Sequence, residues 1–206
     1  MQAIHMTATG APEDVLQLVD IPEPEITAPD QIKVQLRAAG INPVDTKLRS
    51  RGVFFSDALP AILGCDGAGI ITAVGDEVSR FQTGDAVWFC HGGLGGAPGN
   101  YAEYTVLPGA EAELMPASLD FTEAAALPLV LITAWEALFD RGRLQQGQTV
   151  LIHAGAGGVG HVAIQLARSV GARVATTVST AEKAEFARTL GADRAILYTD
   201  EDVHTA

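Results

Sequence analysis

The chain has 206 residues, 48% of them apolar, which is enough to bury one large core or two modest ones. Its 13 basic and 25 acidic residues give a net charge of -12, which argues against nucleic acids and anionic membrane surfaces as partners. No secretory leader and no apolar run of membrane-spanning length is visible, so a cytoplasmic protein is expected.

The first 120 residues are predicted to be rich in β-structure. Apolar side chains alternate with polar ones along Ile32, Val34 and Leu36, the pattern of a strand with one buried face. A short helix is predicted at Asn42–Arg49, because Pro43 suits a first helical turn. Short strands joined by Gly and Asp turns are typical of a compact barrel, in which the glycine-rich stretch from His91 to Asn100 forms a loop. The predicted strands are Met1–Met6, Val15–Ile21, Gln31–Ala38, Ile70–Val74, Val87–Phe89 and Tyr101–Leu107.

The composition changes at Phe121, where an alanine-rich, helix-forming stretch begins. Thr122 is predicted to cap this stretch, and Pro128 is predicted to divide it into two helices. We therefore predict two domains, residues 1–121 and residues 122–206.

The stretch Thr149–Val170 is predicted to be a strand, a glycine turn and a helix in direct succession. Val150, Leu151 and Ile152 form an apolar run without alternation, as expected of a parallel strand covered on both faces. The helix is indicated by apolar residues at helical spacing, namely Val159, Val162, Ala163, Leu166 and Val170.

The turn between this strand and helix has the glycine spacing of a dinucleotide-binding site. It comprises Gly155, Ala156, Gly157, Gly158, Val159 and Gly160. Gly155 is expected to permit the tight turn, Gly157 to let backbone amides approach a pyrophosphate, and Gly160 to allow close contact between helix and strand. The helix N-terminus supplies unpaired N–H groups and a positive dipole end for the phosphates. A glycine-rich turn without a ligand is the alternative.

The remaining residues complete a β-α-β-α-β unit, which is one half of a doubly wound parallel sheet. A strand is predicted at Arg173–Val178, a helix at Ala181–Leu190 and a strand at Ala195–Tyr198. In a half-sheet the Val150 strand becomes an edge, and an exposed apolar edge invites pairing with another chain. The sequence is therefore expected to be part of a longer enzyme.

The end of the second strand indicates the choice of cofactor. A site that prefers NAD places an acidic residue about twenty residues after the glycines, to bind the ribose 2'-hydroxyl. Residues 176–180 contain no acid, whereas Ser179 can bond a 2'-phosphate and Lys183 follows in the first turn of the next helix. NADPH is therefore the predicted cofactor. Lys183 taken alone favours a surface helix residue between Glu182 and Glu185, so the missing acid decides for NADPH.

Five motifs together resemble the zinc-independent quinone oxidoreductase (zeta-crystallin-like) branch of the medium-chain dehydrogenase/reductase superfamily. They are residues 40–46 (GINPVDT), 64–69 (GCDGAG), 99–104 (GNYAEY) and 131–135 (LITAW), with the glycine turn. The resemblance covers essentially the whole chain. It implies an α/β protein with a GroES-like barrel followed by a Rossmann domain, and a substrate reduced in the cleft between them by hydride from NADPH.

The resemblance also assigns residues to the site. It places Asn42 and Thr133 near the nicotinamide and substrate, where an amide and a hydroxyl can bond a developing oxyanion. Asp45 is expected to brace the short helix, with direct proton transfer as the alternative. Lys47 stands where many relatives have a tyrosine; a solvated surface charge and a group that stabilises an enolate are both open. Tyr198 is expected to close the phosphate pocket.

A catalytic metal is not expected. Zinc-dependent relatives carry a cysteine where this chain has Asn42 and a histidine where it has Cys65, and their cysteine-rich zinc lobe is missing between Cys90 and Tyr101. These differences disfavour a zinc alcohol dehydrogenase.

The predicted activity is therefore NADPH-dependent hydride transfer, without a metal, to a small quinone or another α,β-unsaturated carbonyl compound. Such an acceptor spreads the negative charge that hydride delivers, so the protein needs to supply only orientation and electrostatics. The alternative is a truncated, non-catalytic paralogue that binds a nucleotide or a protein partner. By resemblance, the full-length product is expected to form a homodimer.

Overall fold

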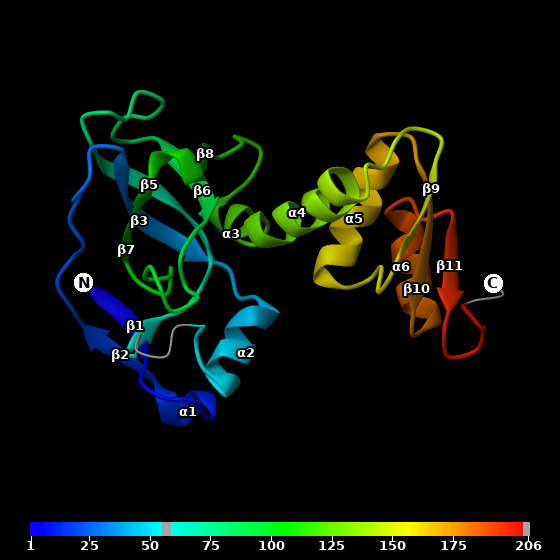
Figure 1. Cartoon of the computed structure of the whole chain (residues 1–206), viewed down its shortest axis with the longest axis horizontal. Helices are drawn as coiled ribbons and strands as arrows, with labels where there is room; N and C mark the ends of the chain where they lie inside the picture. The colour runs from blue at the N-terminus through cyan, green and yellow to red at the C-terminus, as the bar shows by residue number, and fades with distance from the viewer. Residues whose placement is uncertain (55–58, 204–206) are drawn as a thin grey trace. The chain divides into compact units, whose positions relative to one another are not determined.

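The computed structural model describes residues 1–54 and 59–203. The chain divides into two compact units, Met1–Leu129 and Val130–Ala206, which are shown in Figure 1 and described separately below. None of the helices in the described part of the chain has the length and apolar composition that crossing a membrane requires.

The first unit contains two antiparallel sheets (Figure 1). The five-stranded sheet has the order β7-β3-β5-β6-β8, and the three-stranded sheet has the order β2-β1-β4. The strands are β1 (Gln2–Met6), β2 (Leu16–Asp20), β3 (Gln31–Ala39), β4 (Ala61–Ile62), β5 (Asp66–Val74), β6 (Ala86–Cys90), β7 (Tyr104–Pro108) and β8 (Ala112–Leu114). The helices are α1 (Pro12–Val15), α2 (Pro43–Arg51), the 3₁₀ turn η1 (Gly109–Glu111) and α3 (Phe121–Ala125).

The core of the five-stranded sheet follows the alternation seen in the sequence. Ile32 and Val34 of β3 are fully buried, and they pack with Ile71 of β5 and Leu107 of β7. Strand β5 begins at Asp66, four residues before the predicted start at Ile70. Pairing with Cys90 of β6 extends it through a glycine-rich segment that the strand pattern does not cover.

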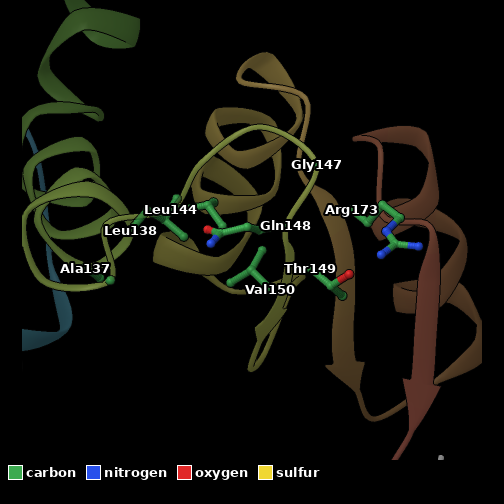
Figure 2. Close-up of a pocket in the computed structure, with 9 residues that line it drawn as sticks. Ala137, Leu138, Leu144, Gly147, Gln148, Thr149, Val150 and Arg173 are labelled. Atoms are coloured by element: carbon green, nitrogen blue, oxygen red, sulfur yellow. The ribbon is translucent and has the colours of Figure 1, made fainter.

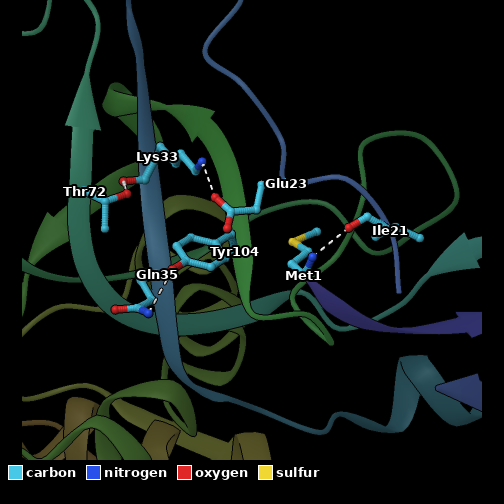
Figure 3. Close-up of polar contacts among 7 residues, drawn as sticks. All are labelled: Met1, Ile21, Glu23, Lys33, Gln35, Thr72 and Tyr104. Atoms are coloured by element: carbon cyan, nitrogen blue, oxygen red, sulfur yellow. Dashed lines mark hydrogen bonds and ion pairs between the residues drawn. The ribbon is translucent and has the colours of Figure 1, made fainter. Parts of the chain in front are cut away.

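Polar contacts fasten the proline-rich segment before β3 to the sheet (Figure 3). The amino group of Met1 donates to the carbonyl of Ile21 at 2.7 Å, and the ammonium group of Lys33 lies 2.8 Å from the Glu23 carboxylate. Within the sheet, the Gln35 amide donates to the Tyr104 hydroxyl at 3.0 Å. The Glu23–Lys33 ion pair thus ties the segment to β3, and the Met1–Ile21 bond ties it to the N-terminus.

Helix α3 packs on the first unit and is capped differently from the prediction. Asp120, and not Thr122, is its N-cap: the Asp120 carboxylate accepts the N–H of Glu123, whose carboxylate in turn accepts the N–H of Asp120. Ala124 and Ala125 are buried with Ala68 of β5. Pro128 does divide the helical stretch as predicted, because it begins α4 (Pro128–Trp135), which continues into the π-helix η2 (Glu136–Arg141).

The second unit contains a parallel sheet with the order β11-β10-β9 (Figure 1). Its elements are β9 (Thr149–Ile152), α5 (Gly158–Ser169), β10 (Arg173–Val178), α6 (Ala181–Thr189) and β11 (Arg194–Leu197), close to the predicted ranges. Its core joins Ile164 and Ala167 of α5 to Val174 of β10 and Ala195 of β11, all of which are buried.

Two burial predictions for this unit were wrong. Leu151 of β9 is 45% exposed, because β9 pairs within the described residues with β10 alone and so lies at the sheet edge. The strand covered on both faces is β10. Val159 is 38% exposed, because it belongs to the first turn of α5 and lies outside the buried face formed by Val162, Ala163 and Ile164.

Candidate active site and nucleotide-binding turn

In the first unit, the candidate catalytic residue Asn42 lies at the start of α2 in a buried polar cluster. Asn42 is the N-cap, with extended backbone, and Pro43 begins the helix. The Asn42 N–H donates to Asp45 Oδ2 at 2.7 Å. Because both side chains are more than 90% buried, this bond fixes the entry of the chain into α2.

The Asn42 side chain is held by a carboxylate from the neighbouring sheet. Asn42 Nδ2 donates to Oδ2 of Asp66 at 2.8 Å, and Oδ1 of Asp66 accepts the N–H of Leu129 at 2.9 Å. Asp66 is fully buried, and burial raises its pKa. The two hydrogen bonds act in the opposite direction, because they favour the ionised form.

Tyr101 completes this cluster from the loop before β7. Its hydroxyl donates to Asp45 Oδ2 at 2.9 Å, and its ring lies against Gly64, where a side chain would collide with it. Burial, followed by the negative charge of Asp45, raises the pKa of Tyr101, so the hydroxyl keeps its proton. The second Asp45 oxygen, Oδ1, is buried and has no hydrogen-bond partner within the described residues.

The pH dependence of stability should reveal the buried carboxyl of Asp66. The pKa of the Asp66 carboxyl is higher in the folded state than in the unfolded state. The stability that this carboxyl contributes is therefore fully present below its unfolded-state pKa and is lost as the pH rises through its folded-state pKa. The unfolding free energy of the wild type relative to Asp66→Asn should therefore fall as the pH rises from the ordinary aspartate pKa through the raised folded-state pKa, by roughly 1.4 kcal/mol per unit of pKa difference. Urea denaturation of both proteins across this range measures it; parallel pH profiles would contradict the raised pKa.

Lys47 and Thr133 are both exposed residues. Lys47 lies on α2, where its carbonyl accepts the Ser50 hydroxyl, and its side chain is not part of the buried cluster around Asn42. Thr133 lies in α4, in the second unit. The roles predicted for both residues stay predictions.

In the second unit, the glycine turn joins the end of β9 to the start of α5. Gly155 and Gly160 are both required to be glycine by close approach: a Cβ on Gly155 would overlap Thr176 Oγ1, and one on Gly160 would overlap the Ala154 carbonyl oxygen. Gly157 is the N-cap of α5, and a Cβ there would lie 3.1 Å from the Ala154 carbonyl oxygen, a tight contact but a looser one than at Gly155 and Gly160. Gly158 is the first residue of the helix, and Ala156 is half-buried in the turn. The N-terminus of this 12-residue helix therefore has the form of an anion-binding site.

The turn contains one residue with a left-handed backbone that the glycine spacing does not indicate. This residue is Ala154, with φ of 55°. Gly155 is needed because β10 passes close beneath it.

The residues predicted to hold a 2'-phosphate come from adjacent elements. Lys183 Nζ donates to Ser179 Oγ at 3.1 Å, across the gap between the end of β10 and the first turn of α6. The Tyr198 N–H donates to the Val178 carbonyl at 3.2 Å, and its side chain is 52% exposed. No acidic residue occupies positions 176–180.

A pocket of about 440 Å³ lies elsewhere in this unit, beside β9 (Figure 2). Gln148, Thr149, Val150 and Arg173 line it, so it lies at the amino ends of β9 and β10. Because ligands of open parallel sheets bind outside the carboxyl ends of the strands, this pocket is not the candidate nucleotide site.

Comparison with known proteins is consistent with this arrangement. Residues 28–117 match the family "Alcohol dehydrogenase GroES-like domain", and residues 158–206 match "Zinc-binding dehydrogenase". The quinone oxidoreductase of Pseudomonas aeruginosa is 41% identical over 97% of this chain and 59% of that protein. The chain belongs to the medium-chain dehydrogenase/reductase superfamily.

Two further relatives of this medium-chain dehydrogenase/reductase have NADPH in their name or structure. The chloroplastic NADPH-dependent alkenal/one oxidoreductase of Arabidopsis thaliana is 42% identical over 92% of this chain and 50% of that protein. The crystal structure of Escherichia coli quinone oxidoreductase complexed with NADPH matches with a TM-score of 0.85 and 36% identity, over 98% of this chain and 60% of that one. The chain thus spans about half to three-fifths of the length of these relatives. The predicted family, with a GroES-like domain and a Rossmann-like sheet, is confirmed.

The residues of this medium-chain dehydrogenase/reductase do not fit a catalytic zinc ion. The Asn42 amide donates to Asp66 and offers no thiolate. The hydrogen bond between the two cysteines raises the pKa of Cys90 and lowers that of Cys65, and burial raises the pKa of Cys90 further, so Cys90 stays a neutral thiol. Residues 1–54 and 59–203 contain no group of three or more His, Cys, Asp or Glu residues arranged to hold a metal.

Four residues of the site, Asp66, Tyr101, Thr176 and Thr177, were given no role by the sequence. Tyr101 stands in a recognised motif, but nothing in its spacing indicates Asp45 as its partner, 56 residues away. Thr176 and Thr177 were noted only for the absence of an acid. A buried threonine pair at the carboxyl end of the central strand is the signal that points to them.

Proposed function

We propose that this protein is an NADPH-dependent reductase that transfers hydride, without a metal, to a quinone or another α,β-unsaturated carbonyl compound. The observation that carries the proposal is the nucleotide-binding turn. Gly155 and Gly160 are held to glycine by close approach of the neighbouring backbone and Thr176, at the N-terminus of a helix that follows a parallel strand. A structure built this way suits a pyrophosphate.

The phosphate end of the cofactor is assigned to two sets of residues. Backbone N–H groups of residues 156–160 other than that of Gly157, which donates to the Ala154 carbonyl, would hold the pyrophosphate. Ser179 and Lys183 would hold the 2'-phosphate, with Tyr198 beside them. Support comes from the 3.1 Å contact between Lys183 and Ser179 and from the missing acid at the end of β10. The relatives whose names or structures include NADPH agree with this choice.

The acceptor end is assigned to Asn42, whose amide would hydrogen-bond the oxygen that becomes negative when the acceptor is reduced. Support comes from its burial and from Asp66, which orients the amide. By family resemblance the Thr133 hydroxyl has the same role. The nicotinamide supplies the hydride when the cofactor is bound.

Turnover tests the proposed function directly. The purified full-length product should oxidise NADPH when a simple benzoquinone or an enone is added, as measured by the loss of cofactor absorbance. Absence of turnover across a varied panel of such acceptors would contradict the proposal and favour the non-catalytic alternative.

Replacing Lys183 should change cofactor preference. We expect Lys183→Gln to weaken NADPH binding about tenfold and to leave NADH binding within about twofold, since only NADPH carries the 2'-phosphate. Arg188→Gln is the matched control, because Arg188 is a cation on the same helix that is paired with Glu185 at 3.4 Å. Titrations with both cofactors, followed by fluorescence, give the ratio. Equal losses for NADPH and NADH in Lys183→Gln would contradict the assignment.

A further inference from the structure

The nucleotide-binding turn contains a residue in an unfavourable backbone conformation. Ala154, the second residue after β9, has φ of 55°, in the left-handed region that residues with a side chain rarely adopt. Its side chain gains nothing visible from this position, because the residue is exposed. Some other contact must therefore hold Ala154 in this conformation.

The conformation of Ala154 determines where the first turn of α5 lies. The Ala154 carbonyl accepts the N–H of Gly157, the N-cap of the helix, at 2.8 Å. The same carbonyl oxygen occupies the space that a side chain on Gly160 would need. A change in the backbone at Ala154 would therefore displace the N–H groups that the proposed function assigns to the pyrophosphate.

Thr177 of the central strand β10 makes the contacts that hold this part of the turn. Its hydroxyl accepts the N–H of Ala154 at 3.1 Å and lies 3.2 Å from Nδ1 of His153. Its carbonyl accepts the N–H of Gly155 at 3.2 Å. One side chain and its own backbone thus contact three consecutive residues of the turn. Thr177 is 96% buried on a strand paired on both sides, so it forms a rigid support.

The neighbouring threonine does something different. The Thr176 hydroxyl donates to the Ile152 carbonyl at 2.6 Å, which joins two strands and does not reach Ala154. The support of the turn is therefore specific to Thr177.

We propose that Thr177 is a positioning residue for the dinucleotide pyrophosphate: its hydroxyl holds Ala154 in the left-handed conformation, so that the turn is formed before the cofactor binds. This inference rests on the proposed function. Thr177 acts through the turn on the pyrophosphate, which NADPH and NADH share. Ser179 and Lys183 are assigned instead to the 2'-phosphate, which only NADPH carries. A preformed turn raises affinity because less conformational freedom is lost on binding.

The test compares Thr177→Val with Thr177→Ser. Thr177→Val keeps the shape of the side chain and removes the hydroxyl; we expect it to weaken NADPH and NADH binding equally, by about fivefold to tenfold, the effect of losing a hydrogen bond. Thr177→Ser keeps the hydroxyl and should bind both cofactors within about twofold of the wild type. Thr189→Val removes a threonine hydroxyl bonded to the Phe186 carbonyl of α6 and should leave binding unchanged. Binding is measured by fluorescence titration well below the melting temperature. Nearly all of each variant is then folded, so a change in stability alone does not change the measured affinity.

A second variant tests the link to Ala154. Glycine adopts the left-handed conformation without strain, so Thr177→Val should cost less than about twofold in affinity in an Ala154→Gly background. If circular dichroism shows that Thr177→Val does not fold, the test uses the double variant Ala154→Gly/Thr177→Val instead. A folded double variant that binds the cofactor supports the inference. A folded double variant that does not bind the cofactor overturns it.

The outcomes separate the two proposals. A wild-type protein that binds neither cofactor overturns the proposed function. A wild-type protein that binds, together with a Thr177→Val protein of the same affinity, overturns only the role of Thr177. A loss restricted to NADPH would also overturn it, because the hydroxyl would then act on the 2'-phosphate.

Discussion

Gly155→Ala is expected to weaken NADPH binding about a hundredfold, the equivalent of roughly 3 kcal/mol, which is the upper range for overpacking a closed site. The added methyl group would overlap Thr176 Oγ1, and Cβ and Cγ2 of Thr176 would each lie 2.9 Å from it. Thr176 is fully buried and its hydroxyl bonds the Ile152 carbonyl, so it cannot rotate away. The turn must move instead, and with it the N–H groups assigned to the pyrophosphate.

A compensating change makes this expectation specific. The three atoms nearest to the new methyl group all belong to the Thr176 side chain, so Gly155→Ala/Thr176→Gly should recover most of the lost affinity. Gly147→Ala is a control for strain alone: Gly147 has φ of 79° and open space around its side-chain position, so the change should cost about 1 kcal/mol of stability and leave binding unchanged. Fluorescence titration with NADPH measures all three variants. Affinity of the wild-type level in Gly155→Ala would refute the crowding argument.

The glycine turn also shows how far a motif can be interpreted without a structure. Its position and the strand and helix beside it follow from spacing and periodicity, which are local properties of the chain. The reason for each glycine is not local. Gly155 is fixed by Thr176 and Ala154 is held by Thr177, and these partners lie more than twenty residues away on another strand.

Burial of the parallel strands likewise depends on partners that are distant in the sequence. The apolar run at Val150–Ile152 predicts a strand correctly, but its composition does not determine its place in the sheet. Leu151 is exposed because β9 lies at the edge among the described strands, whereas β10, which contains two threonines, is covered on both sides. The edge position of this strand follows from the family's strand order, as predicted for a half-sheet, and not from the apolar run, which by itself predicts a covered strand.

The buried polar cluster in the first unit is the other feature that the sequence does not predict. Asn42 and Asp45 were singled out by motif, and their places at the start of α2 fit a capped helix. The partners Asp66 and Tyr101 lie 24 and 56 residues from them and have no common spacing. An aspartate inside an otherwise apolar and glycine-rich strand is the one visible hint, because a buried carboxylate requires donors.

Asp45→Ala is expected to lower the unfolding free energy by about 3 kcal/mol, more than the loss of a surface carboxylate. Its Oδ2 accepts both the N–H of Asn42 and the hydroxyl of Tyr101, and both donors would be left without a partner in a buried place. Asp45→Asn should cost less, about 1 kcal/mol, because the amide oxygen can accept from both donors. Urea denaturation at neutral pH measures these losses, and a cost below about 1 kcal/mol for Asp45→Ala would contradict the role given to the carboxylate.

The Tyr101 bond can be separated from the cap by a double-mutant cycle. Because burial and the charge of Asp45 raise the pKa of Tyr101, the hydroxyl remains a donor throughout the pH range in which the protein can be studied. Tyr101→Phe should therefore cost about 1 to 2 kcal/mol in the wild type and much less in Asp45→Ala, with a coupling of about 1 kcal/mol between the two sites. Additive losses would mean that the 2.9 Å contact contributes no net stability, and that Asp45 acts on the start of α2 alone. A measured coupling would instead show that the loop before β7 and the helix carrying Asn42 are stabilised as one unit.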